Sequence, residues 1–171
     1  MYLLVDAACE LAREFPELQL RLLGRGEPAI VAELQTRAQF AGLPDLLDMP
    51  GFVDRAELPA HFARAHIFAA PSQYEGGPGF VYLEAMACGL PVIACAGSGA
   101  AEVIAPEQTG LLVPAEDVVA LIEVLRRLLS NDTLRASMGE RARRYVLEHA
   151  ESGVCIARIE AFYAQHASRS R

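Results

Sequence analysis

The sequence predicts a Rossmann-like α/β fold, in which one doubly wound parallel sheet lies between two layers of helices. Short apolar runs alternate with longer helical patterns along most of the 171 residues, as in parallel strands joined by crossover helices. Several of these runs end in glycine-rich turns, where a strand passes into a helix. We expect residues 1–171 to form a single domain, because a chain of this size buries roughly 70% of its unfolded surface.

The elements can be placed in order. A helix over residues 1–15 is expected to open the chain, and Pro16 ends it. Strands are expected at 19–23, 46–53, 66–70, 91–95 and 110–113. Helices are expected at 27–42, at 55–65, after the loop at 75–79 and up to Cys88, and at 101–105, 118–129, 133–148 and 154–166. A doubly wound sheet normally opens with a strand, so we expect the first strand to be missing and the chain to be a fragment of a longer protein.

Composition and charge exclude several classes of function. The net charge is −7 and every fixed cation is an arginine, which argues against nucleic acid or an anionic membrane surface as a main partner. No run of 18 apolar residues or signal peptide is found, so we expect no membrane span and a cytoplasmic location. Cys9, Cys88, Cys95 and Cys155 show no metal-ligand spacing, so we expect no metal site and small buried thiols in a reducing compartment.

Four loops should lie at the edge of the sheet where ligands bind, beyond the carboxyl ends of the strands. They cover residues 24–26, 52–54, 72–79 and 97–99, and three of them are rich in glycine. Glycine lets the backbone approach a ligand and expose its N–H groups. Any one of these loops taken alone is better explained as an ordinary tight turn between a strand and a helix, and the binding-site interpretation depends on three of them lying at the same edge.

The most informative segment runs from Pro71 to Ile93, where a strand leads into a glycine loop and then a helix. Pro78 suits the first helical position, so the N–H groups of Gly79, Phe80 and Val81 should point out of the helix start. A helix N-terminus carries about half a positive charge and can bind an anion such as a diphosphate.

Two glutamates accompany this helix. Glu84 should lie in its second turn, where its carboxylate can accept two hydrogen bonds from a ribose diol. Glu75 precedes the helix and could reach another hydroxyl. A solvated surface position is the alternative for Glu84, but its neighbours are so apolar that the helix should be buried, and a buried carboxylate needs a partner.

The segment from Ser72 to Pro91 resembles the signature of the retaining glycosyltransferases of family 4, which have the two-Rossmann B fold. The resembling features are a Pro-Ser turn, Glu75, a glycine loop, Glu84 and the run Ala-Met-Ala-Cys-Gly-x-Pro-Val. Residues 20–28, 51–58, 97–102 and 109–117 resemble further turns of that family in the same order. The resemblance covers most of the chain and is weakest over its last twenty residues.

The resemblance implies a role for each of these positions. Glu84 would bind the ribose of a UDP- or GDP-linked sugar, and Glu75, the implied catalytic residue, would contact the donor sugar or diphosphate. The backbone at Gly79, Phe80 and Val81 would receive the phosphates. The base would lie against Phe52 and Val53, and Gly24 and Gly26 would border the pocket. No cofactor or metal is implied, and the reaction would transfer a hexosyl group to a glycan or lipid-linked acceptor.

This chain departs from the family pattern in two places. One extra residue separates Glu75 from Glu84, which affects the placement of Glu75. The cations that bind the donor diphosphate in the family would precede residue 1, as would the whole N-terminal acceptor domain. We therefore expect this chain alone to be inactive, and we expect an exposed sheet edge that favours self-association. A non-catalytic nucleotide-sugar-binding module and a generic interaction domain are the alternatives.

Overall fold

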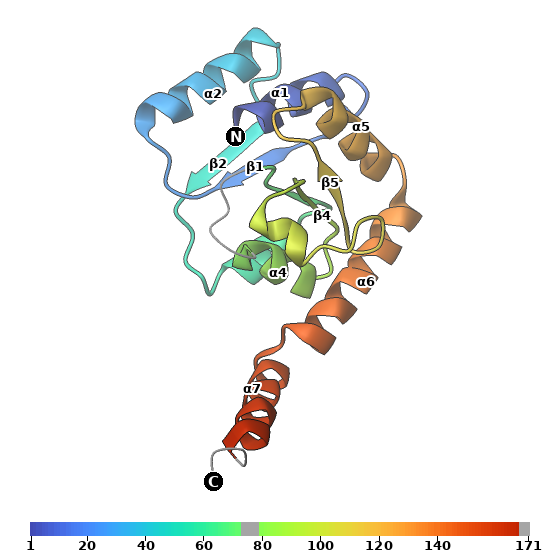
Figure 1. Ribbon diagram of the computed structural model, residues 1–171. Coiled ribbons are helices and arrows are strands. Elements are labelled where there is room, and N and C mark those ends of the chain that lie inside the picture. The colour runs from blue at the N-terminus through green and yellow to red at the C-terminus, as the bar shows by residue number, and fades with distance from the viewer. Residues whose placement is uncertain (73–78, 168–171) are drawn as a thin grey trace.

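The computed structural model describes residues 1–72 and 79–167 (Figure 1). Helices and strands alternate through the first two thirds of the chain, and helices close it. In order, the elements are α1 (Tyr2–Leu11), β1 (Leu20–Leu23), α2 (Pro28–Phe40), β2 (Leu47–Gly51), α3 (Leu58–Phe62), β3 (Phe68–Ala69), α4 (Phe80–Ala87), β4 (Val92–Cys95), the 3₁₀ turn η1 (Gly99–Glu102), β5 (Gly110–Val113), α5 (Val118–Leu129), α6 (Asp132–His149) and α7 (Ser152–Ala167).

Every strand pairing of the described chain is parallel, as predicted, but the pairings fall into two groups. β1 pairs with β2, with Leu20 opposite Leu47 and an irregularity between Arg21 and Leu23. β4 lies between β3 and β5, with Val92 opposite both Phe68 and Gly110. The order is therefore β1–β2 in one sheet and β3–β4–β5 in the other.

The three-layer arrangement is clearest at β4, whose residues are all buried. Val92 and Ala94 pack on one face, in a cluster with Phe62 of α3, Met86 of α4 and residues of α6. Ile93 packs on the opposite face, in a cluster with α1 and α5. Since successive strand residues face opposite sides, this division confirms a parallel sheet that helices cover on both faces.

Helix α1 spans the two strand groups. Its buried residues Leu4, Ala7 and Leu11 share a cluster with the β4–β5 strands and α5, and Leu20 and Leu22 of β1 pack at the margin of that cluster. Ala8 joins a second, smaller cluster with Leu46, directly before β2. One helix therefore holds both groups of strands in the same layer (Figure 1).

Local signals explain where several elements begin and end. The Asp117 side chain accepts a hydrogen bond from Ala120 N (2.9 Å), and the Asn131 side chain accepts one from Leu134 N (2.8 Å), so both cap a helix. Gly89 follows α4 with a φ of +82°, a left-handed position that suits glycine after a helix.

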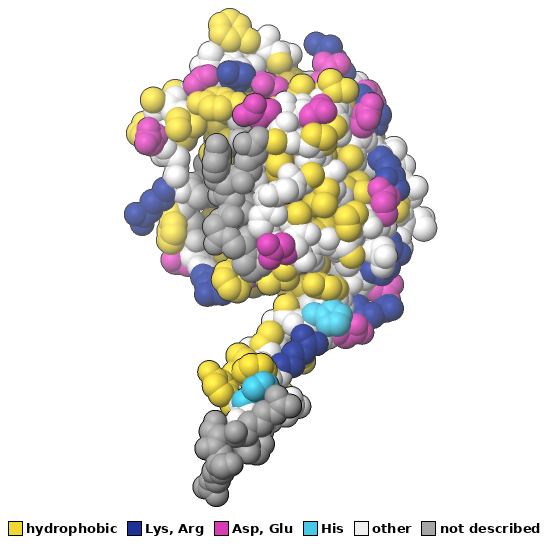
Figure 2. Space-filling view, in the orientation of Figure 1, with side chains coloured by type: hydrophobic (Ala, Val, Ile, Leu, Met, Phe, Trp, Pro, Cys, Tyr) yellow, Lys and Arg dark blue, Asp and Glu magenta, His cyan; other side chains and the backbone are white. Residues whose placement is uncertain are grey.

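The last helix, α7, projects from the body and carries exposed apolar side chains (Figures 1 and 2). Its most exposed large apolar residues are Ile156, Ile159, Phe162 and Tyr163. Helix α6, by contrast, buries Met138, Gly139, Ala142 and Val146 against the domain.

Several predicted elements are shorter in the structure, among them the strands predicted at 46–53 and 66–70, which are reduced to β2 and β3. The first helix ends at Leu11 rather than at residue 15, because Phe15 precedes Pro16 and such residues avoid the helical conformation. The same effect at Ala105, before Pro106, leaves only η1 where a helix over 101–105 was predicted. The helix predicted at 55–65 is confined to the five residues of α3.

Candidate functional site

The loops that follow β1 to β4 lie at the carboxyl ends of parallel strands, which share one edge of the fold. We call this edge the rim: residues 24–26, 52–55, 71–72, 79–81 and 97–99. Glu75, the residue predicted to be catalytic, lies outside the described residues, as do Gly76, Gly77 and Pro78. Its position relative to the rim therefore remains a prediction.

The first rim loop needs both of its glycines. Gly24 has a φ of +131° and donates its N–H to the Gly51 carbonyl (2.9 Å), which ties the end of β1 to the end of β2. A Cβ atom at Gly26 would lie 2.8 Å from Val31 Cγ2 of α2. The turn is therefore tight and brings the start of α2 close to the rim.

Phe52 is the most prominent apolar side chain of the second loop. Its ring is 60% exposed, and the guanidinium of Arg25 lies 4.8 Å from the ring centroid. This cation–π contact joins the loops that follow β1 and β2. Val53, predicted with Phe52 to hold the base, is half-buried.

The start of α4 provides the predicted anion-binding geometry. Gly79 adopts the left-handed conformation (φ +62°) at the N-cap, and no side-chain hydrogen bond caps this end within the described chain. Phe80 is 74% exposed and Val81 is half-buried. The first N–H groups of a helix lack partners inside it and carry its positive dipole end, so Gly79, Phe80 and Val81 can face a negatively charged ligand.

Tyr82 fixes this helix start to the sheet, a role that the sequence did not predict. The side chain is fully buried, and its hydroxyl donates to the Ala70 carbonyl at the end of β3. Its ring packs edge-on against Phe68, with the centroids 5.2 Å apart. The pattern of aromatic and apolar residues predicts burial there, but the carbonyl that accepts the bond is defined only by the fold.

Glu84 lies in the second turn of α4, as predicted, but its surroundings differ from the prediction. The side chain is 32% exposed, and its Oε1 lies 3.0 Å from Nη2 of Arg55, which is 87% exposed. The expectation of a buried carboxylate that requires a ligand as its partner is therefore wrong, because an arginine already pairs with a half-exposed Glu84. Exposed pairs of this kind are weak, so a ligand can displace Arg55 at little cost.

The loop after β2 is the centre of the rim. Phe52 contacts Arg25 of the first loop, and Arg55 contacts Glu84 of α4. Arg55 reaches the second turn of α4 through Glu84, whereas Arg25 contacts the Phe52 ring, and neither pairing was predicted from the sequence. These two contacts join residues that are 27 and 29 positions apart, so they cannot be predicted from local sequence patterns.

In the fourth rim loop, residues 97–99, the serine side chain forms a hydrogen bond within its own turn. Ser98 is buried, and its hydroxyl donates to the Cys95 carbonyl (2.8 Å), while Gly97 has a φ of +82°. The hydroxyl of Ser98 therefore stabilises the turn after β4. The backbone of residues 97–99 is the part of this loop that remains for a ligand.

The remaining chemistry of the described residues is limited. No group of three His, Cys, Asp or Glu side chains gathers there in a way that could hold a metal ion, and no helix in those ranges is long and apolar enough to cross a membrane. All four cysteines are free, but only Cys95 is fully buried and the other three are half-buried. Burial raises the pKa of the Cys9, Cys88 and Cys95 thiols, which keeps them protonated and unreactive.

The parallel strands, the glycine turns and the uncapped helix start together define a Rossmann-like domain with a ligand site at its strand ends. Comparison of the sequence with known protein families identifies the class of protein more narrowly. Residues 2–145 match the family described as Glycosyl transferases group 1, and the chain belongs to this family.

Individual relatives agree with this family. The chain is 35% identical over 153 residues to a GDP-mannose-dependent alpha-(1-6)-phosphatidylinositol monomannoside mannosyltransferase of Mycolicibacterium smegmatis, covering 86% of this chain and 40% of the relative. It superposes on sucrose-phosphate synthase from Thermosynechococcus elongatus with a TM-score of 0.83 and 31% identity, over 98% of this chain and 42% of that one. The C-terminal domain of a glycosyl transferase group 1 family protein from Francisella tularensis aligns with a TM-score of 0.81 and 25% identity, over 88% of this chain and 78% of that domain. The chain therefore spans less than half the length of the first two proteins and most of an isolated C-terminal domain.

Proposed function

We propose that residues 1–171 form the donor-binding half of a retaining glycosyltransferase, whose donor is a UDP- or GDP-linked hexose. The observation that carries this proposal is the uncapped start of α4 beside Glu84, in a chain of the glycosyl transferases group 1 family. The relative from M. smegmatis is named as GDP-mannose-dependent, which supports a nucleoside diphosphate sugar as the donor.

Each part of the donor has a place on the rim. The diphosphate lies against the N–H groups of Gly79, Phe80 and Val81, with the positive end of α4 behind them. The ribose diol donates to the Glu84 carboxylate, from which Arg55 withdraws. The base lies at Phe52 and Val53, with Gly24 and Gly26 at its border.

Catalysis in this proposal depends on stabilising the diphosphate as it leaves. The α4 start and Arg55 supply positive charge near it, and no metal is required. Glu75 contacts the transferred sugar. A second, N-terminal domain holds the glycan or lipid-linked acceptor and closes over the site to exclude water. We place the protein in the cytoplasm, an assignment supported by its four free cysteines.

Calorimetry with UDP and GDP tests the site. We expect Glu84→Ala to weaken nucleoside diphosphate binding at least about tenfold, since each hydrogen bond to a charged group contributes about 1.5–3 kcal/mol. Glu75→Ala should weaken it less, because the extra loop residue displaces Glu75 from the family's position.

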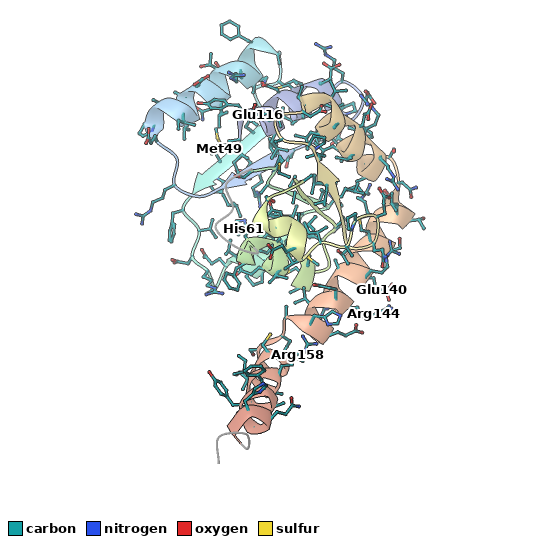
Figure 3. All side chains as sticks on the ribbon, in the orientation of Figure 1. Met49, His61, Glu116, Glu140, Arg144 and Arg158 are labelled. Atoms are coloured by element: carbon teal, nitrogen blue, oxygen red, sulfur yellow. The ribbon has the colours of Figure 1, made fainter. Side chains whose placement is uncertain are left out.

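The matched control is Glu140→Ala. Glu140 pairs with Arg144 on α6 at 3.1 Å, much as Glu84 pairs with Arg55, but it lies on the other side of the molecule from β1 and β2 (Figure 3). Binding that is equal in Glu84→Ala and Glu140→Ala, with both variants folded, would show that the ribose assignment is wrong. We also expect no sugar transfer by this chain alone, and turnover above the buffer rate would contradict the need for a second domain.

A further inference from the structure

Arg25 lies on the rim with a guanidinium that has no polar partner among the described residues. Most other arginines of that part of the chain are paired, as Arg21 is with Asp48 (2.6 Å) and Arg127 is with Glu107 (2.6 Å). Arg25 is exposed, and its guanidinium contacts the face of an aromatic ring instead. Its five N–H donors are therefore available to a ligand.

The ring beneath Arg25 is that of Phe52, which is 60% exposed at the edge of the sheet where ligands bind. The guanidinium carbon lies 4.8 Å from the ring centroid. Exposed aromatic rings of this kind stack on nucleotide bases, since every base has a π face. A base that stacks on Phe52 meets the Arg25 side chain, because both would contact the same ring.

The backbone fixes the two residues relative to each other. Gly24 donates its N–H to the Gly51 carbonyl (2.9 Å), and Arg25 and Phe52 directly follow these two glycines. Both glycines have a positive φ, +131° and +84°, a conformation that other residues rarely adopt. The pair is therefore held at its base by the ends of β1 and β2, while the two side chains can adjust to a ligand.

The free donors of Arg25 distinguish one base from the others. Guanine presents O6 and N7 as two acceptors on one edge, at a spacing that the guanidinium fork matches. Adenine has an amino donor in place of O6, and a pyrimidine such as uracil offers a single acceptor, O4, on the corresponding edge. An arginine at this place therefore favours guanine.

We propose that Arg25 is the residue that selects the base of the donor, and that the base is guanine. Guanine stacks on the Phe52 ring and accepts hydrogen bonds at O6 and N7 from Arg25. This inference rests on the proposed function and narrows its donor from a UDP- or GDP-linked sugar to a GDP-linked one. Arg25 reads only the base, so its effect is separable from that of Glu84, which binds the ribose.

Calorimetry with GDP, inosine diphosphate, ADP and UDP tests the selection. GDP and ADP form the central comparison, because both carry a purine on the same ribose and diphosphate and differ at the base edge. We expect GDP and inosine diphosphate, which share O6 and N7, to bind with similar affinity. ADP and UDP should bind at least about fivefold more weakly.

Two variants separate the reading of the edge from stacking. Arg25→Lys keeps the positive charge but lacks the planar fork, so it should bring the ratio of GDP to ADP affinity close to one. Phe52→Leu keeps an apolar side chain without an aromatic ring, and it should weaken all four nucleotides. The matched control is Arg64→Lys. Arg64 is also exposed, but it precedes β3 and so lies toward the amino ends of the strands, and its replacement should leave the ratio unchanged.

Each result decides for or against the selection by Arg25. Equal binding of GDP and ADP by the wild type, a preference for UDP, or a wild-type ratio in Arg25→Lys would overturn it. If Glu84→Ala still weakens binding in that case, the donor site itself stands. No binding of any of the four nucleotides would overturn both the selection and the proposed function. A ratio that falls in Arg25→Lys, but not in Glu84→Ala or Arg64→Lys, would support the inference.

Discussion

The β3–β4–β5 half and the β1–β2 half of the sheet differ in how completely they are enclosed. Val92 to Cys95 are buried in every position and packed by helices on both faces. β2, whose partner β1 is itself half-exposed, contains no fully buried residue. The wholly apolar β4 and the mixed strands β1 and β2 therefore contribute very different amounts of buried surface, because burial depends on strand composition and on what lies on the neighbouring edge and face.

The two halves of the sheet also contribute rim residues that differ in how firmly they are held. The closed half fixes the α4 start through Tyr82 and its buried hydroxyl contact to Ala70. The open half contributes Arg25, Phe52 and Arg55, which are exposed and make only surface contacts. For the proposed donor site, we therefore expect the phosphate end to be preformed and the base end to become ordered on binding.

The largest expected effect is the loss in the free energy of unfolding when a core side chain is truncated, which we compare between the two halves. Ile93→Ala removes a fully buried side chain from β4 and should lower the free energy of unfolding by about 2–5 kcal/mol. Leu22→Ala, in half-exposed β1, should cost about 1 kcal/mol, since little transfer energy is lost there. Urea denaturation measures both values. Equal losses would mean that the two halves are equally enclosed in solution.

The next effect tests the packing of α6 on the closed half. A Cβ at Gly139 would fall directly on the Gly89 carbonyl oxygen, so Gly139→Ala should destabilise the domain by about 1–3 kcal/mol. Gly153→Ala in α7 is the matched control. Its Cβ would lie 3.0 Å from the Glu151 side chain, a surface carboxylate that can shift, and the change should raise the stability of the helix by less than about 1 kcal/mol, because Glu151 also accepts a hydrogen bond from Val154 N. Thermal melts of the two variants should shift in opposite directions, and a neutral Gly139→Ala would contradict the close contact.

The smallest expected effect concerns an ion pair between Arg126 of α5 and Glu14, which follows α1. Helix α1 is the element that spans both halves of the sheet. Arg126 donates to Glu14 (2.7 Å), and this bond lowers the pKa of the Glu14 carboxyl below its usual value of 4.5. A depressed pKa in the folded state stabilises the fold above about pH 4.5, and the contribution is lost as the pH falls through the folded value. Glu14→Gln should therefore lower the melting temperature slightly at pH 7 and converge with the wild type near pH 3.

Both side chains of this pair are partly exposed, so the expected change in melting temperature is small, and added salt should reduce it further. Glu17→Gln, an exposed carboxylate nearby, serves as the control. A Glu14→Gln deficit that persists unchanged at pH 3 would show that the ion pair is not its cause.

Local signals in the sequence predicted some elements residue for residue. The strand at 110–113 and the helix at 118–129 agree with β5 and α5, because Asp117 caps the helix and the apolar period is regular. β3 is shorter than predicted, at two residues, since strand length depends on the register with β4 rather than on hydrophobicity.

The candidate site was predicted less completely than the fold. The Gly24–Gly26 turn and the start of α4 after Gly79 follow from glycine positions, which act locally. The first helical position is Phe80 rather than the predicted Pro78. The partner of Glu84 was predicted to be a ligand, and the structure shows Arg55 there. A half-exposed ion pair between distant residues leaves no periodic pattern that sequence reasoning could detect.

The sequence by itself determined the parallel α/β class, the order of elements and the loops that form the rim. These depend on the period of apolar residues and on turn residues, which act over a few positions. Only the tertiary structure decided that the strands form two groups under one helix, that Tyr82 bonds to Ala70, and that Arg25 and Arg55 meet Phe52 and Glu84. Each of these depends on segments far apart in the chain, whose relative positions are set by packing of the whole core.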